Sequence, residues 1–380
     1  MKEINEELQI QLLNFDSEKR KKWMQQRLPF SVLFELTPIC NMSCIHCYLQ
    51  KHHSEDMLTY SQIIHIIDIL YNKGILFLTF TGGEIFTRSD FLDIYMYAKK
   101  RGFLVELFSN GYLIDESIIR VLKEYPPLLV DISLYGANEA TYKKITGISG
   151  AFDRVVENCK KLREENIRVS LKSPIIKDTL PDLEKMKSLA ENLGVPFTYT
   201  FEITPTIDKD ESPQKYRVPL DTALSYEFDN YYDQLRRGER NKISNYNEIM
   251  KDLTGSDSVY FCNVALNSFV IDYRGRMCPC MKLRHKGISL FDNEFDKIWE
   301  EFAIYSRKKA SSTYICTQCD AKYYCDICPA EMDFLYGDEE YRPEEACKIA
   351  KIRKAFYENE VSYQEALCLA RNDREVTNYK

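Results

Sequence analysis

Three cysteines stand close together on one short segment of the chain. Cys40, Cys44 and Cys47 follow an apolar, strand-like run over 31–37, in the order Cys-Asn-Met-Ser-Cys-Ile-His-Cys. Three thiolates on one tight loop can hold three irons of a four-iron, four-sulfur cluster and leave the fourth iron without a protein ligand. Zinc sites usually pair two Cys-x-x-Cys units, and no second pair lies beside this loop. The pattern therefore favours a cluster with one open iron over a zinc site or buried free thiols.

The loop resembles the signature of radical S-adenosylmethionine (SAM) enzymes, Cys-x-x-x-Cys-x-aromatic-Cys, with His46 where the aromatic residue usually stands. The resemblance implies that SAM binds the open iron and that an electron from the cluster splits it into methionine and a 5′-deoxyadenosyl radical, which abstracts a substrate hydrogen. The implied activity is that of an oxidoreductase, served by an electron donor of flavodoxin or ferredoxin type. The protein's own share is positioning and exclusion of water, and no catalytic acid or base is identified from the sequence.

The length and composition allow a globular protein of two packed domains. The chain has 380 residues, of which 44% are hydrophobic and 29% charged, enough to bury more than one core. It has thirteen cysteines and no charged-then-apolar leader over 1–10, so we expect a cytoplasmic protein without a disulfide framework. Apolar runs such as 75–81 are far shorter than the ~20 residues of a membrane span. The net charge of −7 without a long basic cluster argues against a nucleic-acid partner.

The first half of the sequence alternates between strand-like and helix-like patterns, which predicts an α/β protein. Helical spacing of apolar residues begins behind a capping box formed by Thr59 and Gln62. Alternating units build a parallel sheet with right-handed crossovers, and the resemblance implies a partial (β/α)6 TIM-type barrel with reactive groups at the carboxyl ends of its strands. The predicted strands are 31–37, 76–81, 104–109, 128–133, 168–172 and 197–202, and further helices are 115–124, 151–165, 180–192 and 223–237.

Polar residues at the ends of the later strands are candidates for binding SAM. The second strand ends in Gly82-Gly83-Glu84, which resembles the family motif for the methionine amino group. Glycines let a backbone approach a ligand closely, and Glu84 can accept from an ammonium group. Alone the motif is a common turn, but its place after the second strand favours binding. Further candidates at strand ends are Ser109, Asn110 and Ser133. Their hydroxyl and amide groups suit contacts with ribose or carboxylate, although such residues are also common in turns.

Lys172 closes the fifth predicted strand. Its ammonium group could contact the methionine carboxylate, or its long side chain could extend into solvent. The sequence leaves these two alternatives open.

Eight further cysteines crowd into 262–347. Their order resembles the SPASM extension of peptide-modifying radical enzymes, which holds two auxiliary four-iron clusters; it departs in the spacing between Cys325 and Cys328, two residues where three is usual. The resemblance assigns one cluster to Cys316, Cys319, Cys325 and Cys347. It assigns the other to Cys262, Cys280 and Cys328, with Cys278 as a candidate fourth ligand. SAM and three [4Fe–4S] clusters are thus the expected cofactors.

Zinc is the structural alternative for this region, because 316–319 and 325–328 both have the Cys-x2-Cys spacing of zinc ribbons. The radical loop upstream favours iron over zinc. Cys159 and Cys368 have no cysteine nearby in the sequence, and we expect both to be small apolar packing residues.

The C-terminal cysteines also narrow the expected substrate. Enzymes with this extension mostly act on peptides or proteins, and the resemblance implies maturation of a ribosomally made precursor peptide by a thioether or carbon–carbon crosslink. Met281 stands where sulfatase maturases carry an acidic base, which disfavours protein oxidation of that kind. About thirty residues precede the first strand, too few for an independent leader-binding domain, so a separate leader-binding protein is a candidate partner.

Two functions of other classes stay open. A radical SAM enzyme acting on a small molecule, in tetrapyrrole maturation or dehydrogenation, would share the same cysteine loop. A non-catalytic iron–sulfur carrier would leave the Gly82-Gly83-Glu84 motif without a purpose.

The expected domain layout is a helical extension (1–30), the partial barrel (31–205), a connection (206–258), the SPASM domain (259–347) and a helical tail (348–380).

Overall fold

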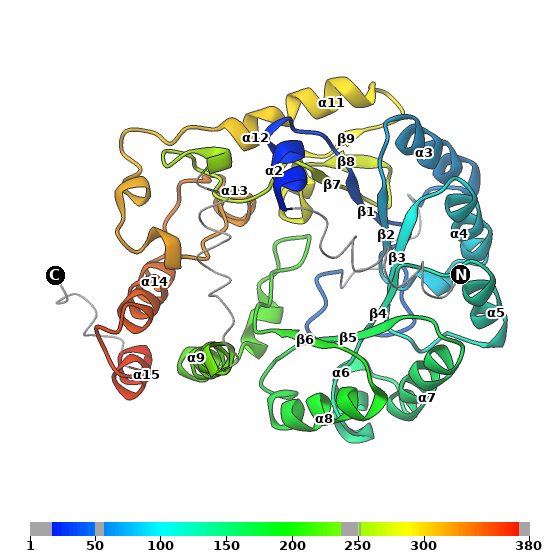
Figure 1. Ribbon diagram of the computed structural model, residues 1–380, viewed down its shortest axis with the longest axis horizontal. Helices are drawn as coiled ribbons and strands as arrows, with labels where there is room; N and C mark the ends of the chain where they lie inside the picture. The colour runs from blue at the N-terminus through cyan, green and yellow to red at the C-terminus, as the bar shows by residue number, and fades with distance from the viewer. Residues whose placement is uncertain (1–16, 50–56, 237–249, 251, 372–380) are drawn as a thin grey trace.

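The computed structural model describes residues 17–49, 57–236, 250 and 252–371. A curved sheet forms the inner wall of the molecule, and helices cover its outer side (Figure 1). The strands of the barrel are β1 (Ser31–Glu35), β2 (Phe77–Thr81), β3 (Leu104–Ser109), β4 (Leu129–Ser133), β5 (Val169–Pro174) and β6 (Phe197–Thr200). Its helices are α3 (Tyr60–Asn72), α4 (Phe91–Lys100), α5 (Glu116–Glu124), α6 (Glu139–Thr146), α7 (Ala151–Glu164) and α8 (Leu183–Leu193). The α/β class and the partial barrel predicted from the sequence are confirmed.

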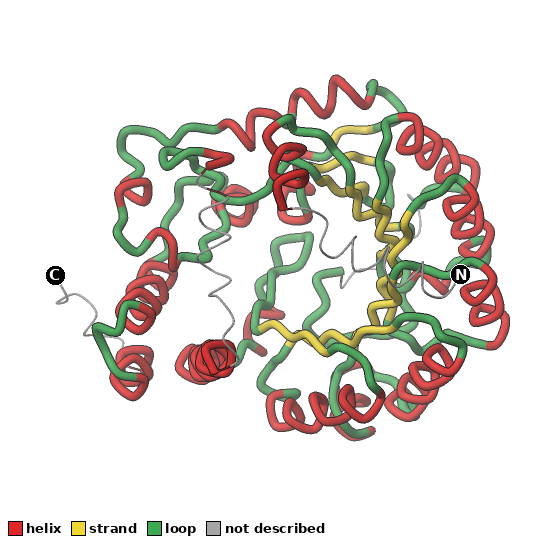
Figure 2. The backbone as a smooth tube through the Cα atoms, viewed as in Figure 1, coloured by secondary structure: helices red, strands yellow, loops and turns green. Residues whose placement is uncertain are grey.

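Other elements precede the barrel or follow it. Helix α2 (Ser17–Gln25) precedes β1, and the long α9 (Leu220–Arg236) follows β6. The later elements are β7 (Ser268–Ile271), β8 (Arg276–Cys278), β9 (Ile288–Ser289), α11 (Phe295–Glu301), α12 (Ala303–Arg307), α13 (Pro329–Tyr336), α14 (Glu344–Tyr357) and α15 (Tyr363–Arg371). The cysteine-rich stretch between α12 and α13 is mostly loop, as Figure 2 shows.

The sheet continues past the barrel into the C-terminal part of the chain. Its nine strands lie in the order β6-β5-β4-β3-β2-β1-β7-β8-β9. Strands β1 to β6 are parallel to their neighbours, and β7 is also parallel to β1, with Ser268 beside Ser31. Strands β8 and β9 are antiparallel additions. The region that carries the later cysteines is therefore built onto the edge of the barrel.

Alternation along the strands divides the barrel into an apolar outer layer and a polar interior. Residues such as Val32 and Leu107 are fully buried with Ile63 of α3 and Ile94 of α4 in one large core. The intervening residues face the inside of the curve because successive side chains point to opposite faces of a strand. In the middle of the sheet these inner residues are polar: Thr79, Glu106, Asp131 and Lys172.

Local signals explain where the helices begin and end. The predicted capping box is present: Thr59 Oγ1 accepts from the Gln62 backbone N–H while the Gln62 side chain accepts from that of Thr59. Helix α6 was not predicted, although Asn138 caps its start and Gly147 ends it in the left-handed conformation. Those two residues are ordinary signals for the start and the end of a helix, so this helix could have been predicted from the sequence.

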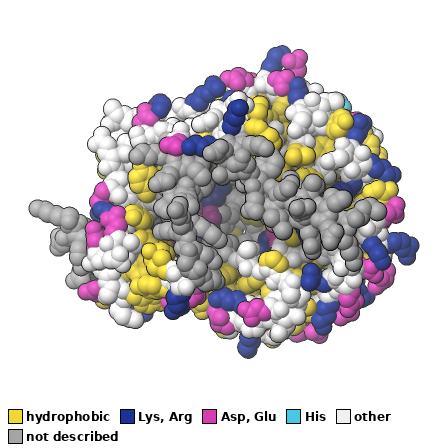
Figure 3. Space-filling model, in the orientation of Figure 1, with side chains coloured by type: hydrophobic (Ala, Val, Ile, Leu, Met, Phe, Trp, Pro, Cys, Tyr) yellow, Lys and Arg dark blue, Asp and Glu magenta, His cyan; other side chains and the backbone are white. Residues whose placement is uncertain are grey.

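The described surface carries charges of both signs. On the face drawn in Figure 3, Lys or Arg and Asp or Glu side chains alternate around the outer rim. Within the described part of the chain, no helix is long and apolar enough to span a membrane.

A backbone clamp fixes the cysteine loop to the end of β2. Gly83 N donates to Thr37 O at 2.7 Å, and Glu84 N donates to Ile39 O at 2.8 Å. A Cβ atom on Gly83 would lie 2.3 Å from Ile39 O, and one on Gly82 would lie 2.3 Å from Thr37 O. Glycine is required at both positions because nothing larger than hydrogen fits between the two backbones.

Replacing Gly83 by Ala should therefore release the cysteine loop. We expect the free energy of unfolding to fall by about 1–3 kcal/mol, as for other overpacked sites, and iron to be lost from the loop. Gly74→Ala is the matched control, since its backbone has φ +74° but nothing lies within 4 Å of the added Cβ; it should lose stability through strain and keep its iron. Full iron retention in Gly83→Ala would show that this contact does not position the loop.

Candidate active site

The cysteine loop and the predicted rim residues meet at one cavity. A cavity of about 510 Å³ lies at the carboxyl ends of the barrel strands, and all three loop cysteines line it. The structure brings most of the predicted SAM contacts to the same wall: Gly82, Gly83, Ser109, Asn110, Ser133 and Lys172. Residues separated by up to 132 positions thus converge because parallel strands present their carboxyl ends on one side.

The three thiols of the loop are close together and largely removed from solvent. Burial, together with the other two thiols, raises the pKa of Cys44 well above its ordinary value, and burial raises that of Cys40 to about 11. Two backbone N–H groups point at the sulfurs: Met42 N lies 3.4 Å from Cys40 Sγ and Leu49 N lies 3.3 Å from Cys47 Sγ. Such donors favour thiolates, and a bound iron would supply the positive charge that keeps the thiolates deprotonated. The loop therefore fits a metal cluster better than three free thiols.

Glu84 lies beneath the cavity wall and joins the loops that follow β2 and β3. Its carboxylate accepts from Asn110 N at 2.7 Å, from Phe86 N at 3.2 Å and from Ser109 Oγ at 2.9 Å. Only 1% of Glu84 is exposed, and burial raises its pKa to about 7. Asn110 in turn links Glu84 to the cysteine loop, since its Nδ2 donates to Asn41 Oδ1 at 2.9 Å and lies 3.7 Å from Cys40 Sγ. Contact between Glu84 and a methionine amino group stays a prediction.

The Glu84→Gln variant tests this connection. A glutamine turns one acceptor oxygen into an amide donor that faces the N–H of Asn110 or Phe86, and an unmade buried hydrogen bond costs about 1–3 kcal/mol. We expect a loss of that size in urea unfolding, with weaker retention of iron. Glu106→Gln is the control: Glu106 accepts from the hydroxyl of Thr79 at 3.1 Å, which can reorient, so the loss should stay below about 1 kcal/mol. Equal losses in the two variants would contradict the role of Glu84.

Lys172 does not simply extend into solvent, which was one of the two alternatives left open by the sequence. Its Nζ lies 2.9 Å from Asp131 Oδ2 and 3.0 Å from the centre of the Phe108 ring, and its side chain is 27% exposed. Burial lowers the pKa of Lys172, and the neighbouring Asp131 and Glu106 carboxylates oppose that shift. The ammonium group is thus held on the cavity wall by an ion pair, and contact with a SAM carboxylate stays a prediction.

His46, the departure from the family signature, also lines the cavity. Its ring lies 5.3 Å from that of Tyr135, so it packs against an aromatic neighbour as an aromatic residue would. Burial lowers its pKa to about 4. A neutral imidazole therefore takes the place of the usual aromatic side chain next to the cysteines.

The C-terminal cysteines form two groups. Cys262, Cys280 and Cys328 are electrostatic neighbours, and burial raises the pKa of Cys262 to about 12 and that of Cys280 to about 11. Cys278 is fully buried on β8, and its thiol donates to the backbone carbonyls of Arg276 and Arg284 at 3.6 and 3.9 Å. The structure thus brings three of the four predicted residues together and gives the thiol of Cys278 backbone partners.

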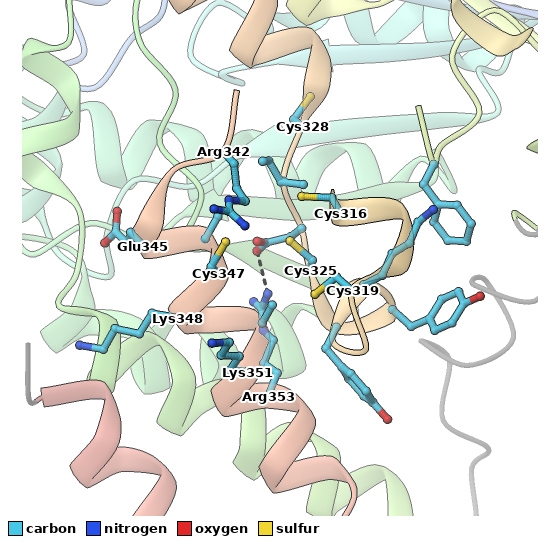
Figure 4. Close-up of a pocket in the computed structure, with 18 of the residues that line it drawn as sticks. Cys316, Cys319, Cys325, Cys328, Arg342, Glu345, Cys347, Lys348, Lys351 and Arg353 are labelled. Carbon is cyan, nitrogen blue, oxygen red and sulfur yellow. Dashed lines mark ion pairs between the residues drawn. The ribbon is translucent and has the colours of Figure 1, made fainter. Parts of the chain in front are cut away.

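The second group lines a larger cavity of about 1360 Å³. Figure 4 shows its four sulfurs turned toward one part of the cavity, with Cys328 apart at the start of α13. Burial raises the pKa of Cys325 to about 11, and the neighbouring thiols add to the shift. Lys and Arg side chains stand around the group, and Arg353 is held by Asp326 at 2.8 Å. The members of the group are those that the sequence predicted: Cys316, Cys319, Cys325 and Cys347.

This grouping bears on the zinc alternative. Cys325 belongs to the second group and Cys328 to the first. The Cys-x2-Cys pair at 325–328 is therefore divided between the two groups and cannot act as one half of a zinc ribbon. Within the described ranges, no three His, Cys, Asp or Glu side chains are placed to hold a single metal ion. Four thiols around a larger cluster do not need to approach each other as closely as the ligands of one zinc ion.

The two remaining cysteines differ from one another. Cys159 on α7 is 1% exposed and packs in the main core, as predicted. Cys368 on α15 is exposed, so the prediction that it packs in an apolar environment is wrong: its helix buries Ala366, Leu367 and Ala370 instead. A single exposed position on an amphipathic helix cannot be assigned from residue type alone.

Sequence reasoning missed several residues of the site. Tyr48 and Tyr135 line the barrel cavity, and so does Met281, which was considered from the sequence only for the acidic base that it lacks. Glu202 lines this cavity and also the larger one, and it pairs with Lys282. The one sequence signal for these residues was proximity to cysteines, since Tyr48 follows Cys47 and Met281 follows Cys280; the contacts themselves join distant parts of the chain.

The fold and the loop define a TIM-type partial barrel with a cysteine-lined cavity at the carboxyl ends of its strands. Comparison with known proteins agrees with this class. Residues 34–190 match the Radical SAM superfamily, so the barrel of this chain is a radical SAM domain and the protein is an enzyme.

Individual relatives resemble different parts of the chain. The AdoMet-dependent heme synthase of Methanosarcina barkeri is 25% identical over 327 residues, 82% of this chain and 94% of the relative. The antilisterial bacteriocin subtilosin biosynthesis protein AlbA of Bacillus subtilis is 28% identical over 177 residues, 46% of this chain and 40% of the relative. The structure of Streptococcus suis SuiB bound to precursor peptide SuiA aligns with a TM-score of 0.67 at 15% identity, over 87% of this chain and 78% of SuiB. The likeness to SuiB is one of fold.

Proposed function

We propose that this protein is a radical SAM maturase that modifies a ribosomally made peptide, by a thioether or carbon–carbon crosslink. One observation carries the radical chemistry: the thiols of Cys40, Cys44 and Cys47 line the same cavity as the rim residues of β2 to β5. These cysteines would hold a [4Fe–4S] cluster, and SAM bound there supplies the 5′-deoxyadenosyl radical that abstracts a hydrogen. In this proposal the radical SAM barrel spans 31–205 and the SPASM domain spans 259–347.

The chain's own residues bind, orient and exclude water. Gly82 and Gly83 bring the backbone to the cavity wall, and Ser109, Asn110 and Ser133 offer hydroxyl and amide groups to SAM. Lys172, held by Asp131, would present a fixed positive charge to a carboxylate. Tyr48 and Met281 close the side of the cavity next to the C-terminal region, which limits the access of water to a radical formed there.

The C-terminal thiols would hold two auxiliary clusters. The group at Cys316, Cys319, Cys325 and Cys347 has four thiols around one cavity. The group at Cys262, Cys280 and Cys328 has three, and Cys278 would have to give up its backbone hydrogen bonds to join it. The raised thiol pKa values mean that cluster binding must release protons, as is usual for thiolate metal sites.

A peptide is favoured over a tetrapyrrole by the cavity and the fold. Haem is a broad macrocycle with two carboxylates, whereas the one Lys or Arg among the described lining residues of the barrel cavity is Lys172, which the proposed site assigns to SAM. Glu202 borders both cavities, so the two cavities lie close to one another, as an extended chain that enters both would require. The fold shared with SuiB, which was solved with a precursor peptide, supports the same choice. The sequence likeness to a heme synthase makes tetrapyrrole maturation the second candidate.

The central test is cleavage of SAM. Anaerobically reconstituted and reduced protein should convert SAM to methionine and 5′-deoxyadenosine, and Cys44→Ala should abolish this, because two remaining thiolates hold the cluster poorly. In the same assay, mass spectrometry should find a peptide encoded beside the gene modified and an iron porphyrin unchanged. Wild-type cleavage by Cys44→Ala would refute the assignment of the loop, and turnover of the porphyrin alone would favour the second candidate.

The number of clusters is tested by metal analysis. Three four-iron clusters give ~12 irons per chain, and one cluster gives ~4. We expect about 12 irons with equal acid-labile sulfide in the reconstituted protein, and about 8 in Cys319→Ala, which lacks one thiolate of the second group. An iron content near 4 together with two zinc ions would contradict the auxiliary clusters and leave the radical domain untouched.

A further inference from the structure

A buried carboxylate joins the cysteine loop of the barrel to the C-terminal region. Glu35, the last residue of β1, is fully buried, and its Oε1 accepts from Tyr48 Oη at 3.0 Å. The same carboxylate forms an ion pair with Arg284, 249 positions away, whose side chain is 11% exposed. Tyr48 directly follows Cys47, and Arg284 lies in the short 3-10 helix (Met281–Lys286) that follows Cys280. One side chain thus contacts both cysteine-bearing segments.

The contacts of the arginine extend to the wall of the cavity. Arg284 Nη2 lies 4.0 Å from Met281 Sδ, and its guanidinium carbon lies 5.6 Å from the centre of the Tyr48 ring. Tyr48 and Met281 both line the barrel cavity, whereas Glu35 and Arg284, which contact them, do not. The pair therefore supports two cavity residues that come from opposite ends of the sequence.

Stability alone does not account for this pair. Taking two charges out of water offsets most of their attraction, and apolar residues of similar size often serve a fold as well or better. Glu35 Oε2 and Arg284 Nε also lack hydrogen-bond partners among the described residues. What the ion pair provides, and an apolar contact would not, is a fixed direction for the Tyr48 hydroxyl and for the segment after Cys280.

We propose that Glu35 and Arg284 are positioning residues that hold Tyr48 and Met281 as one wall of the cavity and so couple SAM cleavage to modification of the substrate. This role rests on the proposed function. Neither residue touches the reacting atoms; both act through the side chains they orient. A wall that shifts would admit water and misplace the substrate hydrogen, so the radical would be spent without product.

The test compares single and double apolar replacements in the reconstituted holoenzyme. Glu35→Met and Arg284→Met each leave a buried charge without a partner and should lose stability, whereas the double variant Glu35→Met/Arg284→Met should regain most of it. The ratio of 5′-deoxyadenosine to modified peptide should nevertheless rise about tenfold in the double variant as in the singles. A double variant that regains both stability and the wild-type ratio would overturn the proposal, because the pair would then be structural only.

Arg276→Met is the matched control. Arg276 also pairs with a buried carboxylate in the C-terminal region, Asp272, at 2.6 Å, and neither residue lines the barrel cavity. Its ratio of 5′-deoxyadenosine to product should stay within about twofold of wild type. An equal rise in Arg276→Met would also overturn the proposal, since any loss of an ion pair in this region would then have the same effect.

A readout that needs no substrate separates this proposal from the proposed function. Hydrogen exchange over 281–287 and around Tyr48 should quicken in the double variant and not in Arg276→Met, and the electron paramagnetic resonance spectrum of the reduced protein with SAM should change only in the former. If the wild type cleaves no SAM, the proposed function fails by itself. Unchanged exchange and spectra in the double variant would refute the positioning role even if the enzyme is active.

Discussion

Two backbone hydrogen bonds between 37–39 and 83–84 hold the cysteine loop in place, and the rest of the site depends on them. They form because the two glycines leave room for the chain to pass carbonyl groups at a distance that no Cβ would permit. Glu84 then carries the connection to β3 through its buried carboxylate. The Gly-Gly-Glu segment therefore has a structural role whether or not it binds a ligand. Its two glycines are required by the backbone contact with the cysteine loop.

The inside of the barrel is polar because the sheet does not close. A closed TIM barrel fills its centre with side chains, whereas here Glu106, Asp131 and Lys172 stand on the inner face with partial access to solvent. Each carries a partner from the neighbouring strand: Thr79 for Glu106, Ser170 for Asp131 and Asp131 for Lys172. Charges on this face are thus compensated within the sheet, which leaves an interior that can hold a polar ligand without an apolar plug.

The sequence predicted what is local or carried by a strong spacing, and missed what is distant. The six strands and the capping box at Thr59 follow from periodicity and from motifs, whereas the grouping of the C-terminal cysteines was an implication of the resemblance to the SPASM extension. The pairing of β7 with β1 does not, because no pattern links segments 237 positions apart. The same holds for Glu35 with Arg284 and for Lys172 with Asp131, since a charge can be read from the sequence but its partner across a fold cannot. The prediction for Cys368 failed for a local reason: cysteine is usually buried, but this position lies on the exposed side of its helix.

The continuous sheet has a consequence for how the two halves work together. Since β7 extends the barrel directly beside β1, the segment after β8 reaches the cavity wall through Met281 without a flexible linker. The Glu202–Lys282–Glu331 contacts lie on the other side of the same segment, and Glu202 borders both cavities. A substrate held in the barrel thus lies against the chain that carries Cys280. In the proposed reaction the radical would form in a cavity lined by Met281, the residue after Cys280, because the pairing of β7 with β1 fixes this segment beside the barrel.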